Sequence, residues 1–248
     1  MGHVIDFRDE YESVCLVSGL IGLVGSGEYL PSMLEVERRL IEGRSPIYVQ
    51  IPTAATLESP SRLRYWLELG EQQARRLGVE PVPIVIRDRS EANDPELIAP
   101  IAEAGLVYLS GGSPTHLIET IKDTLLSTVL FKAFENGTSV AGCSAGAMAL
   151  GAYSPGLRHL PPRLIEGIGL VKGIAIVPHF DKVRNRITSS IFRHEARLMP
   201  SVTLVGVDEE TALVGDGITF EVMGRGCAWK ILGDEMIKIC EGESLTLQ

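Results

Sequence analysis

Short apolar runs alternate with amphipathic stretches along most of the chain, a pattern typical of a parallel sheet whose strands are joined by helices. Runs such as Ile47–Ile51 are apolar almost throughout, as expected for strands that are covered on both faces. The pattern predicts strands at Leu20–Val24, Ile47–Ile51, Val82–Ile86, Leu106–Leu109, Ser139–Gly142, Ile174–Val177 and Val202–Val207. It predicts helices at Ser32–Ile41, Ser61–Leu77, Pro95–Ala104, Thr115–Ile121, Leu125–Glu135, Ala145–Leu150 and Lys182–Leu198.

The last part of the chain has a different pattern. Short strands at Ala212–Val214, Ile218–Val222 and Ala228–Ile231 are separated by glycine-rich turns, which predicts antiparallel hairpins added to one edge of the sheet. The expected fold is therefore α/β, with three layers and a mostly parallel sheet of the flavodoxin-like type. No linker or repeat divides the 248 residues, so we expect a single domain over 1–248, with residues 1–15 as a terminal extension.

Composition and charge exclude several classes of partner. The net charge of −9 repels phosphate backbones, which argues against nucleic-acid binding. The longest apolar stretch, Val14–Gly25, is too short to span a bilayer, and the acidic segment before it is unlike a secretory signal. We therefore expect a cytoplasmic protein that does not associate with membranes.

Cofactor chemistry has no signature in the sequence. The four cysteines (Cys15, Cys143, Cys227 and Cys240) form no Cys-x-x-Cys pair, so reduced thiols are expected. The histidines lack the spacing of metal ligands, and the turn after the first strand lacks the dinucleotide-binding glycine pattern. We predict neither a metal nor another cofactor.

The strongest chemical signal is the segment Gly142-Cys143-Ser144-Ala145-Gly146, which lies between a predicted strand and a helix of small residues. This context is typical of a nucleophile elbow, a sharp turn that exposes its central serine above a helix N-terminus. The N–H of Ala145 would then face a developing oxyanion. A packing turn built from small residues is the alternative. Cys143 is expected to fold back into the core as an inert thiol.

A second glycine-rich turn, Ser110-Gly111-Gly112-Ser113, follows another predicted strand. The carboxyl ends of parallel strands meet at one edge of a sheet, where ligands bind. The N–H of Gly112 could therefore complete an oxyanion hole with Ala145, although a simple tight turn fits the sequence equally well.

A serine nucleophile requires a general base and a group that orients it. His179 directly follows an apolar strand, whereas His3, His116, His159 and His194 do not, so His179 is the expected base. The acid must come from another strand end, and Glu209 after Val202–Val207 is the first choice, with Asp208 second. A solvated acidic loop is the alternative reading.

These motifs together resemble those of the cyanophycinase and dipeptidase E family of serine peptidases. The resemblance runs from about Leu20 to Ile231 and rests on Ser110-Gly111-Gly112, Gly142-Cys143-Ser144-Ala145-Gly146-Ala147, Pro178-His179-Phe180 and Gly206-Val207-Asp208-Glu209-Glu210-Thr211-Ala212. It implies a class I glutamine amidotransferase-like fold and amide hydrolysis through an acyl-enzyme. It also implies that Ser144 is the nucleophile, His179 the base and Glu209 the acid, with Gly112 and Ala145 as oxyanion donors.

The positions that bind substrate in cyanophycinases differ here. Pro114 stands where the family has a glutamine, Val177-Pro178 replaces an Asp-Gln pair, and the arginines after the histidine are displaced to Arg184 and Arg186. Ser113, Pro114, His116, Arg184 and Arg186 are the candidate substrate contacts, although arginines on a helix are more often simply exposed.

The expected function is that of a serine peptidase or amidase that cleaves a small peptide-like substrate. A non-catalytic amidotransferase-like binding protein and an esterase or acyltransferase with the same three residues are the alternatives. If the chain self-associates, we expect a homodimer, which is the commonest assembly of such domains.

Overall fold

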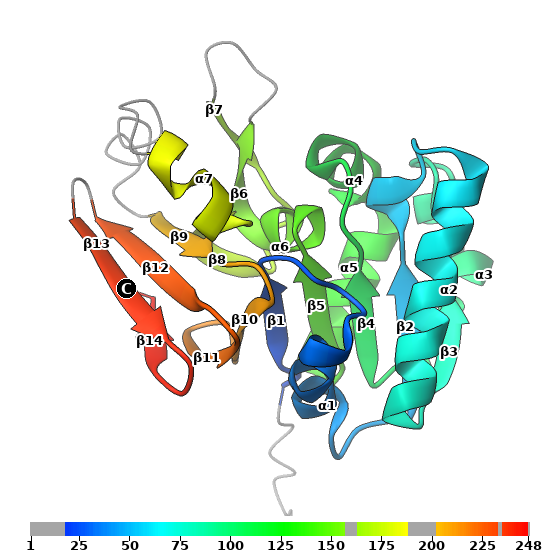
Figure 1. The fold of residues 1–248 in the computed structure, drawn as a ribbon. Coiled ribbons are helices and arrows are strands. Elements are labelled where there is room, and N and C mark those ends of the chain that lie inside the picture. Colours follow the sequence, from blue (N-terminus) through cyan, green and yellow to red (C-terminus); the bar gives the residue numbers. More distant parts are fainter. Residues whose placement is uncertain (1–17, 157–162, 188–201, 233–234, 248) are drawn as a thin grey trace, which may run out of the picture.

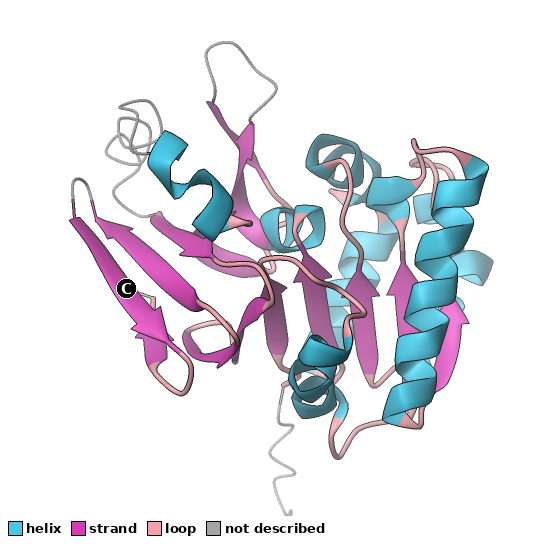
Figure 2. Cartoon of the chain, viewed as in Figure 1, coloured by secondary structure: helices cyan, strands magenta, loops and turns pink. Residues whose placement is uncertain are grey.

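The computed structural model of the protein describes residues 18–156, 163–187, 202–232 and 235–247. These residues form two sheets with helices packed around the larger one (Figures 1 and 2). The larger sheet has eight strands in the order β14-β11-β10-β1-β5-β4-β2-β3. Its strands are β1 (Ile21–Val24), β2 (Ile47–Ile51), β3 (Glu80–Pro83), β4 (Leu106–Leu109), β5 (Ser139–Cys143), β10 (Thr211–Gly215), β11 (Thr219–Gly224) and β14 (Ser244–Thr246).

The five strands β1 to β5 run parallel, and the other three extend the sheet in antiparallel fashion beyond β1. In the centre, β5 lies between β1 and β4, so the segments that leave the carboxyl ends of these three strands are neighbours. Each of the three strands is fully buried, which agrees with their continuous apolar sequences. Chemistry-bearing residues that follow β1, β4 and β5 are thereby gathered at one edge of the sheet.

A second sheet of six strands lies beside the first, in the order β13-β12-β9-β8-β6-β7. Its strands are β6 (Gly151–Gly156), β7 (Arg163–Glu166), β8 (Val171–Val177), β9 (Thr203–Val207), β12 (Cys227–Leu232) and β13 (Glu235–Cys240). Within it, β6, β8 and β9 are parallel, and the remaining strands pair in antiparallel fashion. The C-terminal hairpins therefore divide between the two sheets: β10 and β11 join the first, whereas β12 and β13 join the second.

Helices cover both faces of the first sheet. Seven α-helices are described: α1 (Leu34–Ile41), α2 (Pro60–Leu77), α3 (Pro95–Ile98), α4 (Pro114–Ile121), α5 (Leu125–Glu135), α6 (Ala145–Leu150) and α7 (Phe180–Ile187). Short 3-10 turns precede or follow several of them: η1 (Pro31–Met33), η2 (Thr53–Ala55), η3 (Glu91–Asn93) and η4 (Ala99–Glu103). Helices α1 and α2 pack on one face and α5 on the other, while α6 lies between the two sheets (Figure 1).

Two helix ends show how the local sequence sets these boundaries. Ser59 caps α2 by accepting a hydrogen bond from Arg62 N, and Pro60 occupies the first helical position, where its missing N–H has no cost. Gly78 ends the helix with φ of 76°, a left-handed conformation that glycine adopts without strain.

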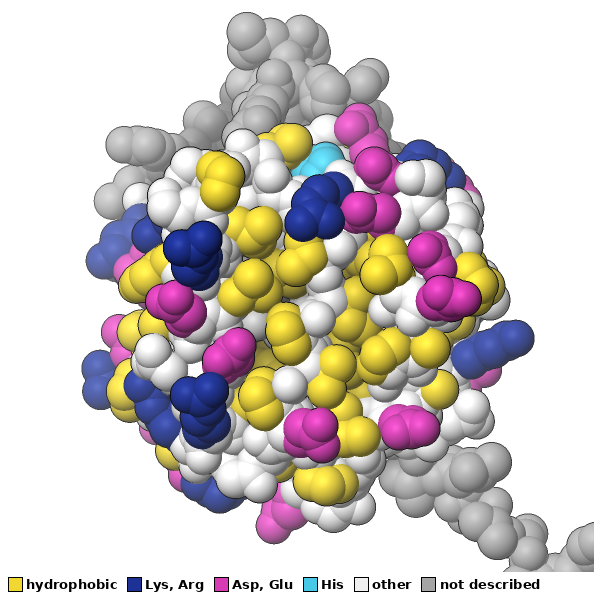
Figure 3. Space-filling view, turned by 90° about the vertical axis from the view of Figure 1, so that its right-hand side faces the viewer, with side chains coloured by type: hydrophobic (Ala, Val, Ile, Leu, Met, Phe, Trp, Pro, Cys, Tyr) yellow, Lys and Arg dark blue, Asp and Glu magenta, His cyan; other side chains and the backbone are white. Residues whose placement is uncertain are grey.

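The edge of the first sheet at β3 is protected from further strand pairing. Glu80 N and Ile84 N both donate to the β2 side, so the alternate residues Pro81 and Pro83 direct their backbone outward. Because proline has no N–H, the outer edge offers no backbone donor at these two positions. The side of the molecule around this edge carries many apolar side chains ringed by charged ones (Figure 3).

Several predicted boundaries were wrong. The strand expected at 82–86 begins at Glu80 and ends at Pro83, because its pairing register with β2 places Glu80 opposite Ile47 and Pro83 opposite Gln50. The helix expected at 95–104 changes to a 3-10 turn after Ile98, since Pro100 cannot donate an α-helical hydrogen bond. The helix expected from Lys182 begins at Phe180, and its predicted end at Leu198 lies outside the described residues. The terminal extension at 1–15 also lies outside them.

A buried polar network occupies the core on the α1 side. Glu37 is fully buried and accepts hydrogen bonds from Tyr48 Oη at 2.9 Å and from Gln73 Nε2 at 3.1 Å. Burial raises the pKa of Glu37 to about 7, and these two hydrogen bonds oppose the rise only in part. The folded protein therefore binds a proton at Glu37 more tightly than the unfolded chain does.

This raised pKa predicts a pH-dependent contribution to stability. It is fully present below the ordinary glutamate pKa of 4.5 and is lost as the pH rises through about 7. Glu37→Gln retains an acceptor for Gln73 and a hydrogen bond with Tyr48 but cannot ionise. We expect the variant to exceed the wild type in free energy of unfolding by up to about 3 kcal/mol at pH 8, with the gap closing below pH 5. Urea denaturation at several pH values measures this, and a pH-independent difference would contradict it.

Candidate active site

Ser144 lies in a strained turn at the end of β5. Its backbone has φ of 48° and ψ of −104°, and it directly precedes α6. Two glycines make the turn possible, because a Cβ on Gly142 would overlap the backbone of Gly146, and one on Gly146 would overlap the carbonyl of Leu109. The helix therefore packs tightly against the strand ends, and the Ser144 side chain is left partly accessible.

The structure brings Ser144, His179 and Glu209 into one chain of hydrogen bonds. Ser144 Oγ lies 3.0 Å from His179 Nε2, and His179 Nδ1 lies 2.9 Å from Glu209 Oε1. His179 follows β8 and Glu209 follows β9, and these parallel strands are neighbours in the second sheet. The site thus lies where a strand end of the first sheet meets two strand ends of the second. Side-chain exposures of 39% for His179 and 36% for Glu209 leave it open to solvent.

Asp181 supports Glu209 from the other side. Its Oδ1 accepts a hydrogen bond from Glu209 N at 3.0 Å, and Lys182 Nζ lies 3.3 Å from Asp181 Oδ2 and 3.5 Å from Glu209 Oε2. Partial burial by itself would raise the pKa of Asp181. The Glu209 N–H and the Lys182 ammonium outweigh this effect and hold the pKa of Asp181 below its ordinary value. This contact of Asp181 with the Glu209 backbone was not predicted from the sequence.

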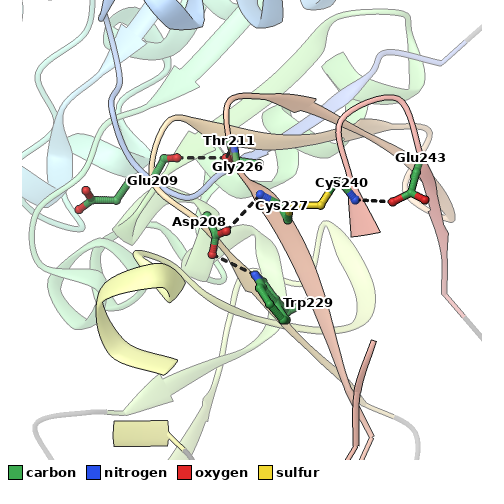
Figure 4. The surroundings of a disulfide bond; sticks show 8 residues. All are labelled: Asp208, Glu209, Thr211, Gly226, Cys227, Trp229, Cys240 and Glu243. Carbon is green, nitrogen blue, oxygen red and sulfur yellow. Dashed lines mark hydrogen bonds between the residues drawn. A yellow bond between two sulfur atoms is a disulfide. The ribbon is translucent and has the colours of Figure 1, made fainter. Parts of the chain in front are cut away.

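Asp208 has a different neighbourhood from Glu209 (Figure 4). Its carboxylate accepts hydrogen bonds from Cys227 N at 3.1 Å and from Trp229 Nε1 at 3.0 Å, both on β12. Of the two acids considered for His179, the structure therefore brings Glu209 to the imidazole and ties Asp208 to the second sheet. The Glu209 carbonyl accepts a hydrogen bond from Thr211 Oγ1, which in turn accepts one from Gly226 N.

The two expected oxyanion donors come from neighbouring strand ends, because Gly112 follows β4 and Ala145 begins α6 directly after Ser144. Within the described residues, neither Gly112 N nor Ala145 N has a hydrogen-bond acceptor. Gly112 adopts φ of 139°, and a Cβ there would overlap the backbone of Ala54. Glycine is thus required at this position for both conformation and space.

The candidate substrate contacts serve mostly structural roles in the free protein. Ser113 caps α4 by accepting from His116 N at 3.4 Å, and Pro114 is the first residue of that helix. His116 Nε2 lies 2.9 Å from Thr56 Oγ1, which links α4 to η2. The Arg184 guanidinium lies over the Trp229 ring, 5.4 Å from its centroid. The side chain of Arg186 lies outside the described part, as do His3, His159 and His194.

Glu28, just after β1, is the most informative residue that sequence analysis passed over. Its carboxylate is buried, and it accepts hydrogen bonds from Gly111 N at 2.9 Å and from Cys143 Sγ at 2.8 Å. Burial, reinforced by this carboxylate, raises the pKa of the Cys143 thiol well above its ordinary value, and Cys143 is buried as expected. In the sequence, the only indication of a role for Glu28 is its position in the turn after β1, whose carboxyl end lies beside that of β5.

The expectation of reduced thiols was wrong for two of the four cysteines. Cys227 and Cys240 form a disulfide (Figure 4). They are separated by 13 residues and carry no pairing motif, but the register of β12 and β13 places them directly opposite each other. Cys15 lies outside the described residues. In the part of the chain that the structure describes, no cluster of ligands could hold a metal, and no helix is long and apolar enough to cross a membrane.

The arrangement of strands, with a serine turn after β5 and a histidine after β8, is the class I glutamine amidotransferase-like fold. A solved peptidase from an acI-B1 Actinobacterium shares it, with a TM-score of 0.82 and 37% identity over 93% of this chain and 98% of that one. The model of peptidase family S51 matches residues 20–223, and the chain therefore belongs to this family. The resemblance stated from the motifs is confirmed.

More distant relatives extend the comparison. The cyanophycinase of Thermosynechococcus vestitus is 32% identical over 163 residues, 61% of this chain and 49% of that protein. The cyanophycinase of Nostoc sp. is 28% identical over 198 residues, 74% of this chain and 63% of that protein. The chain thus spans about half to just under two thirds of the length of these relatives. A putative peptidase E protein from Listeria monocytogenes shares only the fold, with a TM-score of 0.53 and 16% identity over 89% of this chain and 98% of that one.

The disulfide makes a direct prediction about stability. Cys240→Ser should lower the free energy of unfolding by about 2–3 kcal/mol, because the bond no longer restricts the unfolded chain. Urea denaturation measures the loss, and wild-type protein under a thiol reductant is the matched control, since it should lose a similar amount. Peptide mapping without reductant should recover a peptide that links the two cysteines. Recovery of both as alkylated thiols would contradict the bond.

Proposed function

We propose that the protein is a serine-type peptidase or amidase that cleaves a small peptide-like amide through an acyl-enzyme on Ser144. The observation that carries the proposal is the continuous hydrogen-bonded chain from Ser144 Oγ through His179 to Glu209 Oε1. A hydroxyl, an imidazole and a carboxylate in this order form a catalytic triad. Membership of peptidase family S51 agrees with this chemistry.

In the proposed reaction, Ser144 Oγ attacks the carbonyl carbon of the amide while His179 Nε2 takes the hydroxyl proton. The resulting tetrahedral intermediate carries a negative oxygen, which the N–H groups of Gly112 and Ala145 stabilise. His179 then gives its proton to the leaving nitrogen as the C–N bond breaks. A water molecule, deprotonated by His179, cleaves the ester in the second half of the cycle and restores the Ser144 hydroxyl.

Glu209 orients the imidazole and stabilises the imidazolium that forms during each half-reaction. Asp181 and Lys182 hold Glu209 through its backbone N–H and its second carboxylate oxygen. The strained φ of 51° at His179 supports the assignment, because such conformations cluster at functional sites. The turn at Ser144 has the geometry expected of a nucleophile elbow.

The substrate we propose is a small peptide-like amide rather than cyanophycin itself. Pro114 begins a helix in place of the family's glutamine, and Arg184 stacks on Trp229. The polar groups with which cyanophycinases hold their substrate are therefore missing or engaged elsewhere. Similarity to the cyanophycinases therefore supports amide hydrolysis as the type of reaction more than it supports cyanophycin as the substrate.

The proposal predicts that Ser144→Ala abolishes covalent labelling by a fluorophosphonate probe, since the probe reacts only with an activated serine. His179→Gln and Glu209→Gln should lower the labelling rate by about 10³-fold or more, because each removes part of the base system. Labelling is followed by gel fluorescence and by the mass of the modified peptide. Ser244→Ala, at an exposed serine on β14, is the matched control and should label as the wild type does.

Hydrolysis itself is tested with a panel of aminoacyl amides beside p-nitrophenyl esters. We expect turnover of an amide that depends on Ser144. Turnover of esters alone would favour an esterase or acyltransferase, and labelling undiminished in Ser144→Ala would overturn the assignment of the nucleophile.

A further inference from the structure

The buried carboxylate of Glu28 connects the three strand ends that surround the nucleophile. Glu28 follows β1, its Oε1 accepts from Gly111 N after β4, and its Oε2 accepts from Cys143 Sγ at the end of β5. Because β5 lies between β1 and β4, the carboxylate can reach both Gly111 and Cys143, the residue directly before Ser144. No step of the proposed reaction uses Glu28, yet a buried carboxylate is costly unless its hydrogen bonds offset the loss of water.

The neighbouring residue holds the same loop. Tyr29 Oη lies 2.6 Å from Ser110 Oγ and accepts a hydrogen bond from Gln50 Nε2 at 2.9 Å. Tyr29 is fully buried and adopts φ of 65°, a strained conformation for a large side chain. Glu28 and Tyr29, which follow β1, are thus hydrogen-bonded to the two residues that follow β4, Ser110 and Gly111. A strained backbone such as that of Tyr29 persists only where its surroundings constrain it strongly.

These hydrogen bonds determine which backbone N–H of the loop at residues 110–113 is left without an acceptor. Gly111 N is bound by Glu28 and Ser113 N by the carbonyl of Ala54, at 2.9 and 2.8 Å. Gly112 N, between them, has no acceptor among the described residues, and Gly112 is exposed whereas Gly111 is buried. Two hydrogen bonds on opposite sides of one residue therefore prevent the peptide units from rotating and keep the middle N–H available.

The space between the Glu28 carboxylate and Gly111 is also too small for any side chain at Gly111. A Cβ on Gly111 would lie 2.6 Å from Glu28 Oε1 and 3.6 Å from the Cβ of Ser144. A side chain at this position would therefore collide with the Glu28 carboxylate and contact Ser144, so only glycine fits between them. Any rotation of the Gly111 peptide changes the distance between Gly112 N and the oxygen of a substrate bound at Ser144.

We propose that Glu28 is a positioning residue, whose carboxylate fixes Gly111 and Cys143 and thereby holds the Gly112 N–H in place for the oxyanion formed at Ser144. The proposal rests on the proposed function, because it needs an oxyanion to stabilise. An oxyanion donor contributes only in the transition state, so a displaced donor slows the reaction without unfolding the protein.

The test compares two substitutions of similar size. Glu28→Gln keeps a carbonyl oxygen that can accept from Gly111 N, whereas Glu28→Met fills the same buried space without an acceptor. We expect Glu28→Met to lower the rate constant of fluorophosphonate labelling at least about 10-fold, and Glu28→Gln to stay within about threefold of wild type. Glu35→Met, on the exposed face of α1, is the matched control and should label as the wild type does.

Amide hydrogen exchange of the peptide that contains Gly111 provides a second readout. If Glu28 only stabilised the fold, exchange at Gly111 and the rate of fluorophosphonate labelling would not change together. It should be faster in Glu28→Met and unchanged in Glu28→Gln, with both variants unfolding cooperatively near the wild-type temperature. Labelling of Glu28→Met within twofold of wild type would overturn the proposal. If Glu28→Met does not fold, Glu28→Gln decides alone: unchanged exchange and labelling support the proposal, and faster Gly111 exchange with unchanged labelling overturns it.

The two proposals fail in different ways. Labelling that persists in Ser144→Ala would remove the proposed function and with it the need for an oxyanion donor. Loss of labelling in Ser144→Ala, together with wild-type labelling in Glu28→Met, would remove only the role of Glu28 and leave the nucleophile in place.

Discussion

The hydrogen bond between Ser144 Oγ and His179 Nε2 depends on two sheets being held together at one point. Ser144 follows a strand of the first sheet, and His179 follows a strand of the second. Helix α6 lies between the sheets, every one of its residues is buried, and it packs against strands of both. Its alanines and glycine allow this close approach, because larger side chains would separate the sheets and with them the two reacting atoms.

Backbone strain is concentrated around this contact. Of the five non-glycine residues with positive φ in the described chain, Tyr29, Ser144, His179 and Glu210 lie in or beside the site. Each such conformation costs on the order of 1–3 kcal/mol and persists only where the surrounding packing and hydrogen bonds over-determine it. The buried strand ends and the hydrogen bonds of Glu28, Asp181 and Glu209 provide that constraint.

Sequence reasoning identified the fold class and the family, and it selected three residues that the structure brings together. It succeeded because a residue directly after an apolar strand must lie at the edge of the sheet, whichever strands are neighbours. It missed Asp181 and Glu28, which act through a backbone N–H and a buried loop rather than through the imidazole. Such contacts depend on how the loops that follow different strands meet in space, which local sequence patterns do not determine.

The chain by itself therefore determined the parallel α/β core, the strand-to-helix turn at Ser144, and the placement of His179 and Glu209 at strand ends, because periodicity and turn residues are local properties. Only the tertiary structure decided how the C-terminal hairpins divide between two sheets and that Cys227 and Cys240 pair. It also decided which of two adjacent acids meets the imidazole. The physical reason is that strand register and loop crossing arise from packing between segments far apart in the chain, where a shift of one residue reverses the direction of every side chain.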